Sequence, residues 1–199
     1  MLLNEAMLLS EALKGINVYL IGMMGSGKTT VGQVLAEQLQ YRFFDTDAVI
    51  EQAAQQPITQ IFATEGEPAF RDLESQVLGE LSVYTRLVIA TGGGIILRRS
   101  NWGYLRQGLV IWLDVAVDHL FDRLAEDTTR PLLQDPDPKQ KLQTILTERQ
   151  SLYAQADLRI AIEPGESPEQ ITAQILQAIP TVLKQPDAWS DDRSFENRN

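Results

Sequence analysis

The sequence has little or none of several residue types on which common classes of functional site depend. Its 199 residues include no cysteine and a single histidine. Disulfide scaffolds, thiolate metal sites, cysteine nucleophiles and histidine-rich metal centres are therefore excluded. Its apolar runs are also far shorter than the roughly 18 to 20 residues that a membrane-spanning helix requires. We therefore expect no transmembrane helix.

Positive charge is also scarce. The chain carries 17 Lys and Arg against 27 Asp and Glu, a formal net charge of −10. Such a chain would repel a nucleic-acid backbone or an anionic membrane surface, so neither is an expected partner. Residues 1–15 form a leucine-rich, partly acidic segment without the basic start of a signal peptide, which predicts a short amphipathic extension and a cytoplasmic protein. Any anionic ligand must be bound by a local group of basic residues.

Composition and length predict one globular domain. Hydrophobic residues make up 44% of the chain and charged residues 22%, which suffices for a sizeable core. We expect this single domain to span residues 16–184, with the N-terminal extension before it and a polar, mobile tail over 185–199. Residues 125–138 contain three prolines and are predicted to form a mobile lid or, failing that, a surface loop.

Short apolar segments alternate with segments of helical periodicity. The segments that predict strands are 17–21, 41–44, 87–90, 109–113 and 158–162. The first is followed by a helix predicted over 29–40, and the last by one that begins after Ser167 and ends near Ile179. This alternation predicts an α/β fold, a parallel sheet covered by helices on both faces.

A phosphate-binding loop follows the first predicted strand. Residues 22–29 read Gly-Met-Met-Gly-Ser-Gly-Lys-Thr, which matches G-x-x-x-x-G-K-[ST]. Its backbone N–H groups surround phosphate oxygens, Lys28 reaches the β and γ phosphates, and the Thr29 hydroxyl can bind Mg²⁺. Because the motif lies between a strand and a helix, we expect it to bind a nucleotide. The predicted contacts from this loop are Gly25, Ser26, Gly27, Lys28, Thr29 and Thr30.

Two aspartates are candidates for the carboxylates beside the phosphates. The strand at 87–90 ends in Thr91 without an acid, whereas Asp45 and Asp47 leave the second strand two residues apart. In an extended chain both carboxylates would point to the same side, towards the strand ends where ligands bind. The alternative for such a D-x-D sequence is an Asx turn or a helix cap.

Three adjacent glycines and several arginines complete the candidates. Gly92, Gly93 and Gly94 end the third strand, where bare backbone can approach a polar substrate or simply make a tight turn. A single arginine is most often a solvated surface charge, and Glu74 and Glu148 could pair with two of those present.

The ordered set of these motifs resembles the shikimate kinase family. It comprises the phosphate-binding loop, F-D-T-D, G-E-x-x-F-R-x-x-E (66–74), T-G-G-G, R-P-L-L (130–133) and E-R (148–149), and extends over about four fifths of the chain. The resemblance implies a three-layer P-loop kinase fold with a five-stranded parallel sheet in the order 2-3-1-4-5 and a mobile lid. It also implies transfer of phosphate from ATP to the 3-hydroxyl of shikimate with Mg²⁺, in the pathway to chorismate and the aromatic amino acids, by a monomer.

The resemblance assigns roles on the acceptor side. Asp47 would hold and help deprotonate the 3-hydroxyl, and Arg71 and Arg149 would bind the carboxylate of shikimate. Glu74 would orient Arg71. The loop Gly92–Gly94, and Gly93 in particular, would donate backbone hydrogen bonds to the substrate.

The resemblance also assigns roles on the nucleotide side. Thr29 and Asp45 would hold Mg²⁺, Arg130 on the lid would move onto the transferring phosphate together with Lys28, and Arg123 would stack beside the adenine. The scarcity of other bases supports Asp47, since the single histidine, His119, is predicted to lie on the surface of a helix.

Two other interpretations remain open from the sequence. A kinase of the same fold could phosphorylate gluconate or a nucleoside monophosphate, because two arginines also suit a nucleotide phosphate. A non-catalytic relative could bind nucleotide as a regulator, although such a protein would have no need of the complete set of charged residues.

Overall fold

The fold is known from a computed structural model, which describes residues 9–124 and 137–183. The tail predicted over 185–199 lies outside these residues, as do Arg130 and nearly all of the segment predicted to form a lid.

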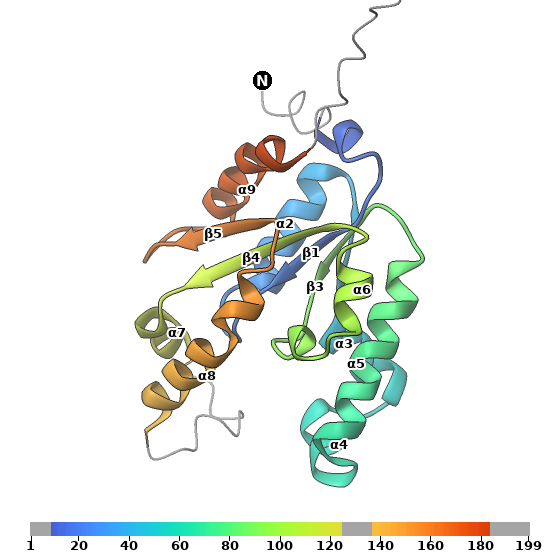
Figure 1. Ribbon diagram of the computed structural model, residues 1–199, viewed down its shortest axis with the longest axis vertical. Helices are drawn as coiled ribbons and strands as arrows, with labels where there is room; N and C mark the ends of the chain where they lie inside the picture. The colour runs from blue at the N-terminus through green and yellow to red at the C-terminus, as the bar shows by residue number, and fades with distance from the viewer. Residues whose placement is uncertain (1–8, 125–136, 184–199) are drawn as a thin grey trace, which may run out of the picture.

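Five parallel strands form one sheet (Figure 1). Its order is β2-β3-β1-β4-β5, which confirms the order implied by the resemblance. Each strand is short and apolar because both faces of the sheet are covered. The strands are β1 (Val18–Ile21), β2 (Arg42–Asp45), β3 (Leu87–Ala90), β4 (Leu109–Val115) and β5 (Leu158–Ile162).

Helices connect consecutive strands. The helix α2 (Lys28–Leu39) joins β1 to β2, and α9 (Pro168–Val182) follows β5 and packs against α2. The remaining helices are α3 (Thr46–Ala54), α4 (Ile58–Thr64), α5 (Gly66–Ser82), the 3₁₀ turn η1 (Ile95–Leu97), α6 (Asn101–Leu105), α7 (Val117–Leu124) and α8 (Pro138–Tyr153).

Helices cover both faces of the sheet. On one face, α2 lies so close to the strands that a Cβ at Gly32 would come within 2.6 Å of the Phe43 ring. On the other, the ring of Tyr153 at the end of α8 stacks on Trp112 of β4, with 5.6 Å between the ring centroids. Phe43 pairs with Val88, which pairs with Val18, whereas Trp112 pairs with Ile21. Val18 and Ile21 are three residues apart on β1, so the side chains of Phe43 and Trp112 lie on opposite faces. The predicted three-layer arrangement is therefore confirmed.

The first described residues pack onto the core. Residues 9–12 are helical and Leu13 is only 1% exposed, although we predicted the domain to begin at residue 16. Part of the amphipathic extension therefore contributes to the core.

Two local expectations need correction. The last helix begins with the predicted cap, in which Ser167 and Gln170 exchange hydrogen bonds, but it continues through Pro180 to Val182. Pro180 lacks an N–H donor and its ring crowds the carbonyl of Leu176, but only two residues of the helix lie beyond it. The chain is also not extended from Asp45 to Asp47, because α3 begins at Thr46.

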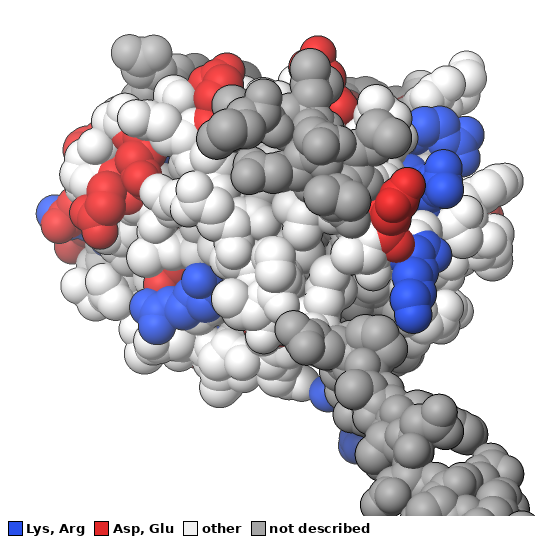
Figure 2. All heavy atoms as spheres, turned by 90° about the horizontal axis from the view of Figure 1, so that it is seen from above, with Lys and Arg blue, Asp and Glu red and all other residues white. Residues whose placement is uncertain are grey.

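The charges of the surface are mixed. Figure 2 shows a face on which acidic and basic side chains both stand near the edge of a largely uncharged centre. In the described part of this face, then, no continuous basic surface is available to a polyanion. Among the helices of the described residues, none is both long enough and apolar enough to cross a bilayer.

Candidate active site

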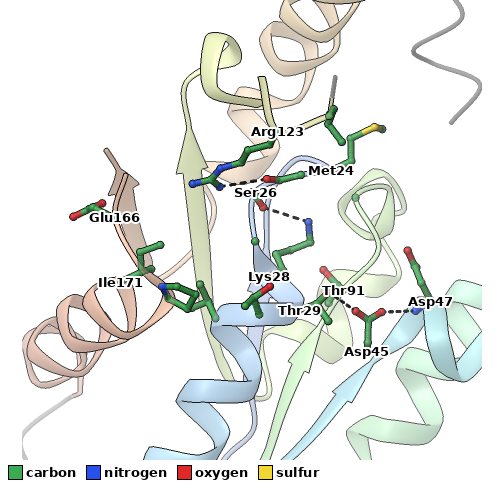
Figure 3. A pocket seen from close by; sticks show the side chains of 17 residues that line it. Met24, Ser26, Lys28, Thr29, Asp45, Asp47, Thr91, Arg123, Glu166 and Ile171 are labelled. Carbon is green, nitrogen blue, oxygen red and sulfur yellow. Dashed lines mark hydrogen bonds between the residues drawn. The ribbon is translucent and has the colours of Figure 1, made fainter. Parts of the chain in front are cut away.

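A cavity of about 510 Å³ opens where β1, β2 and β3 end. Parallel strands place the loops that follow them at one edge of the sheet, the usual position of a ligand site in such folds. Figure 3 shows side chains from the phosphate-binding loop, from the end of β2 and from α9 around this cavity. Ten of the predicted site residues line it: Gly25, Ser26, Gly27, Lys28, Thr29, Thr30, Asp45, Asp47, Gly93 and Arg123.

The loop of residues 22–29 has a backbone conformation that requires glycine at three of its positions. Gly25 and Gly27 have φ values of 76° and 89°, and a Cβ at Gly22 would lie 2.6 Å from the carbonyl oxygen of Leu113. Nζ of Lys28 donates to the carbonyl oxygens of Gly22 and Met23, at 3.0 and 2.8 Å. The ammonium group is thus kept at the cavity by the loop itself (Figure 3).

Asp45 both caps a helix and lies beside the phosphate-binding loop, the two alternatives that the sequence left open. It is the N-cap of α3, since its Oδ1 accepts a hydrogen bond of 3.0 Å from the backbone N–H of Asp47. Its Oδ2 accepts a hydrogen bond of 2.6 Å from the hydroxyl of Thr29. Both aspartates still line the cavity, because the helix begins where β2 ends.

The oxygen atoms of Thr29 and Asp45 fit a magnesium ion. A hydroxyl and a carboxylate oxygen, 2.6 Å apart across the loop, are hard donors of the kind that Mg²⁺ prefers. No group of three acidic, histidine or cysteine side chains able to hold a metal occurs in the described residues. Magnesium bound together with a nucleotide needs only one or two carboxylates, because phosphate oxygens and water complete its coordination.

Arg123 and the segment after β5 form the far wall of the cavity. Nη1 of Arg123 donates to the carbonyl oxygen of Gly25 at 3.4 Å. The segment after β5 contributes Glu166, Pro168 and Ile171, which sequence reasoning missed as site residues. Their sequence indicates only the start of a helix. The strand order could have identified them, because β4 and β5 lie on the side of β1 that is opposite β3, and the segment after β5 leaves the sheet at the same edge as the other loops.

Arg71 on α5 is fixed by two glutamates. Its Nη1 donates to Oε2 of Glu74 at 2.5 Å and its Nη2 to Oε1 of Glu67 at 2.8 Å. Burial disfavours the charged guanidinium, but the two carboxylates outweigh it, and the pKa of Arg71 is raised. Arg71 therefore remains a cation in a fixed orientation.

Glu74 is an unusually buried carboxylate. It is 1% exposed, and its Oε1 finds no hydrogen-bond partner among the described residues. Burial raises the pKa of Glu74, Arg71 opposes this only in part, and the charge of Asp47 adds to the increase. The charge of Asp47 is thus close enough to disfavour ionisation of Glu74.

The glycine loop after β3 lies against these charged groups. A Cβ at Gly92 would meet Oε1 of Glu74 at 2.5 Å and Oδ1 of Asp47 at 2.7 Å, and a Cβ at Gly94 would overlap the guanidinium of Arg71. The backbone N–H of Gly92 donates to the hydroxyl of buried Thr46 at 2.9 Å. Gly92 therefore provides space for two carboxylates, while its N–H is already engaged within the protein.

Arg149 reaches the same loop from α8. Its Nη1 donates to the carbonyl oxygen of Gly93 at 3.1 Å, and the hydroxyl of Tyr153 donates to the same oxygen at 3.2 Å. Tyr153 is another residue that sequence reasoning missed, since a tyrosine four residues after an arginine predicts only a shared helix face. Asp47, Arg71 and Arg149 thus all lie against the loop Gly92–Gly94, although neither arginine lines the cavity. His119 on α7 is half-buried rather than on the surface.

Comparison with known proteins decides the family. A sequence model of the family described as shikimate kinase matches residues 24–180. The chain belongs to the shikimate kinase family. A shikimate kinase from Trichormus variabilis is 60% identical over 180 residues, which are 90% of this chain and 99% of the relative.

Solved structures agree with membership of the shikimate kinase family. Shikimate kinase from Acinetobacter baumannii in complex with shikimate has a TM-score of 0.79 and 41% identity, over 86% of this chain and 97% of that one. A gluconokinase from Sinorhizobium meliloti has a TM-score of 0.51 and 19% identity, over 85% of this chain and 94% of that one. This second likeness shows a shared fold alone.

Proposed function

We propose that this chain transfers the γ-phosphoryl group of ATP to the 3-hydroxyl of shikimate, releasing shikimate 3-phosphate and ADP. One arrangement carries the proposal. Arg71 and Arg149 come from different helices and both contact the glycine loop that also adjoins Asp47. Two guanidinium groups near a carboxylate suit an acceptor with a carboxylate at one end and a reactive hydroxyl at the other.

On the acceptor side, the two arginines bind the carboxylate of shikimate and Asp47 orients its 3-hydroxyl. Arg71 and Arg149 hold the substrate carboxylate through paired N–H donors, and the backbone of Gly93 and Gly94 adds hydrogen bonds. Asp47 accepts a hydrogen bond from the 3-hydroxyl and takes up its proton as the new P–O bond forms. Because little proton has moved in a loose transition state, Asp47 contributes largely by positioning the attacking oxygen.

On the nucleotide side, the loop of residues 22–29 and the start of α2 hold the phosphates. Lys28 neutralises charge on the β and γ phosphates, and Arg123 lies beside the adenine. Arg130, outside the described residues, belongs to the segment that we propose closes over the site, and it contacts the transferring phosphoryl group. In this proposal the lid spans 125–138 within a catalytic domain over 16–184.

Thr29 and Asp45 hold Mg²⁺ in this proposal. Bound there with ATP, the ion neutralises negative charge on the phosphate oxygens. The hydrogen bond between the two side chains keeps both oxygen atoms at the mouth of the loop. The proposed acting unit is a monomer, as the resemblance implies, and the excess of acidic residues disfavours a nucleic-acid or membrane partner.

The test is ADP release by the purified chain with ATP and Mg²⁺ in the presence of shikimate, gluconate, AMP or no acceptor. We expect rapid release with shikimate alone. Equal release without an acceptor, or release only with gluconate or AMP, would overturn the proposal. The Lys28→Ala variant serves as the control for contaminating kinases, and it should be inactive with every acceptor.

A further inference from the structure

Two donors converge on one backbone oxygen in the acceptor half of the site. The carbonyl oxygen of Gly93 accepts from Nη1 of Arg149 at 3.1 Å and from the hydroxyl of Tyr153 at 3.2 Å. A carbonyl oxygen has two lone pairs, so these two donors use its full capacity. The peptide group between Gly93 and Gly94 is therefore held from the side of α8 by two side chains that lie one helical turn apart.

A peptide group that is held at its oxygen is fixed as a whole. Because the group is planar, the direction of the Gly93 C=O bond sets the direction of the Gly94 N–H bond. Glycine has no side chain to limit its backbone rotation, and here two glycines flank this peptide. Without the two donors, the most mobile residues of the loop would have to keep this orientation by themselves.

The same peptide adjoins the second arginine. The guanidinium of Arg71 lies against the Cα of Gly94, so closely that a Cβ there would overlap it. One peptide group thus contacts both arginines, Arg149 through its oxygen and Arg71 through the next Cα. Arg71 is held by its two glutamates, so the position of Arg149 relative to Arg71 depends on the orientation of this peptide.

Tyr153 is well suited to hold the peptide. It is fully buried, and its ring stacks on Trp112, which lies in turn beneath the guanidinium of Arg159 at 4.9 Å. Burial raises the pKa of the Tyr153 hydroxyl, and Arg149 opposes this only in part, so the hydroxyl keeps its proton. A ring fixed in this way presents its O–H at a constant place.

We propose that Tyr153 is a positioning residue for the acceptor: its hydroxyl fixes the Gly93–Gly94 peptide and thereby the spacing of Arg71 and Arg149. This inference rests on the proposed function, because it assigns the two arginines to one substrate carboxylate. Tyr153 itself acts through the loop and Arg149.

The test uses Tyr153→Phe, which keeps the ring and its stacking and removes only the hydroxyl. Loss of one hydrogen bond to a positioned carbonyl predicts an increase of about three- to tenfold in the KM for shikimate. The KM for ATP and the kcat at saturating shikimate should change less than twofold. The matched control is Tyr19→Phe, which alters a fully buried tyrosine on β1 whose ring adjoins Gly108, just before β4 and at the end of the sheet opposite the site.

A second measurement needs no substrate. In ¹⁵N-labelled protein, the amide signal of Gly94 and the Nε–Hε signal of Arg149 should shift in Tyr153→Phe and stay in place in Tyr19→Phe. If the wild type ignores shikimate but these signals shift, the proposed function fails and the positioning of the peptide stands. If the wild type uses shikimate but the signals and the KM for shikimate are unchanged, the positioning role is wrong.

Equal changes in both KM values would also contradict the inference, because they would indicate a general loss of structure. A double variant provides the remaining check. Since Tyr153 acts partly through Arg149, the effects of Tyr153→Phe and Arg149→Lys on shikimate binding should not add. Full additivity would overturn the shared role.

Discussion

In the proposed site, the groups that bind the nucleotide phosphates come chiefly from one continuous segment, whereas the acceptor half is assembled from four. Residues 22–29 provide the phosphate loop with its lysine and hydroxyl, and their own carbonyl oxygens hold Lys28. The acceptor groups come from α3, α5, α8 and the loop after β3. Arg149 and the loop are bonded to residues distant in sequence, and Arg71 is held by a buried carboxylate. A local motif thus provides the phosphate loop, and the fold assembles the acceptor groups.

The two halves also differ in how their charges are screened. Thr29 and Asp45 meet near solvent, whereas Glu74 is 1% exposed and Arg71 is 16% exposed. A buried charge that loses its partner is costly, because water cannot replace the lost interaction. A substitution that removes one charged group of the acceptor half should therefore also leave its buried partner without a compensating charge.

The largest effect is expected at Asp47, where the halves meet. Asp47→Asn keeps the size of the side chain and removes its charge and its ability to accept a proton. We expect kcat to fall by about two orders of magnitude or more. Calorimetry should give an unchanged Kd for ATP. A kcat near that of the wild type would show that Asp47 neither positions nor deprotonates the acceptor.

The second effect isolates the acceptor half. Gly94→Ala places a methyl group where the guanidinium of Arg71 lies, although the φ of −98° at Gly94 suits alanine. Displacement of Arg71 should raise the KM for shikimate at least about tenfold and leave the KM for ATP unchanged. Gly103→Ala is the control, since nothing lies within 4 Å of a Cβ at that helical position. Equal kinetics for the two variants would contradict the packing of Arg71 on the loop.

The third effect isolates the nucleotide half. Thr29→Val preserves the shape of the side chain and removes the hydroxyl that donates to Asp45. The KM for the Mg²⁺ complex of ATP should rise about tenfold, with the Kd for shikimate unchanged. Thr29→Ser retains the hydroxyl and should behave like the wild type within about threefold. Weaker shikimate binding in Thr29→Val would mean that the halves are not independent.

The smallest effect concerns pH and the buried carboxylate. Burial raises the pKa of Glu74 above its ordinary value of 4.5, so the folded chain binds this proton more tightly than the unfolded chain does. The stability that this proton contributes is complete below about pH 4.5 and is lost as the pH rises through the raised pKa.

Glu74→Gln removes this titration, so thermal melts at several pH values can detect it. The Tm of the wild type relative to that of Glu74→Gln should decline as the pH increases above 4.5. If the Tm of the wild type relative to that of Glu74→Gln instead rises with pH, the ion pair with Arg71 outweighs burial and the pKa of Glu74 is lowered.

The comparison of the two halves also explains how far the sequence could be interpreted. The phosphate loop was predictable residue by residue, because the turn, the helix start and the lysine are all local. The strands were predictable as short apolar segments, and the strand order followed from the resemblance, which depends on the order of the motifs along the whole chain.

Features that depend on distant packing were not predictable. Nothing local to Tyr153 indicates that its hydroxyl meets Gly93, 60 residues away. Pro168 and Ile171 were predicted only as part of a helix, and the start of α3 at Thr46 could not be decided, because the D-x-D sequence suits a helix cap and an extended chain. In each case the deciding partner lies on another element.

The position of the transferred phosphoryl group tests the central claim most directly. The wild-type chain is incubated with ATP, Mg²⁺ and shikimate, and the product is identified by ³¹P–¹H correlation NMR. The proposed function predicts a single phosphate ester at the 3-hydroxyl of shikimate. A phosphate ester at another hydroxyl, or inorganic phosphate as the sole product, would contradict it.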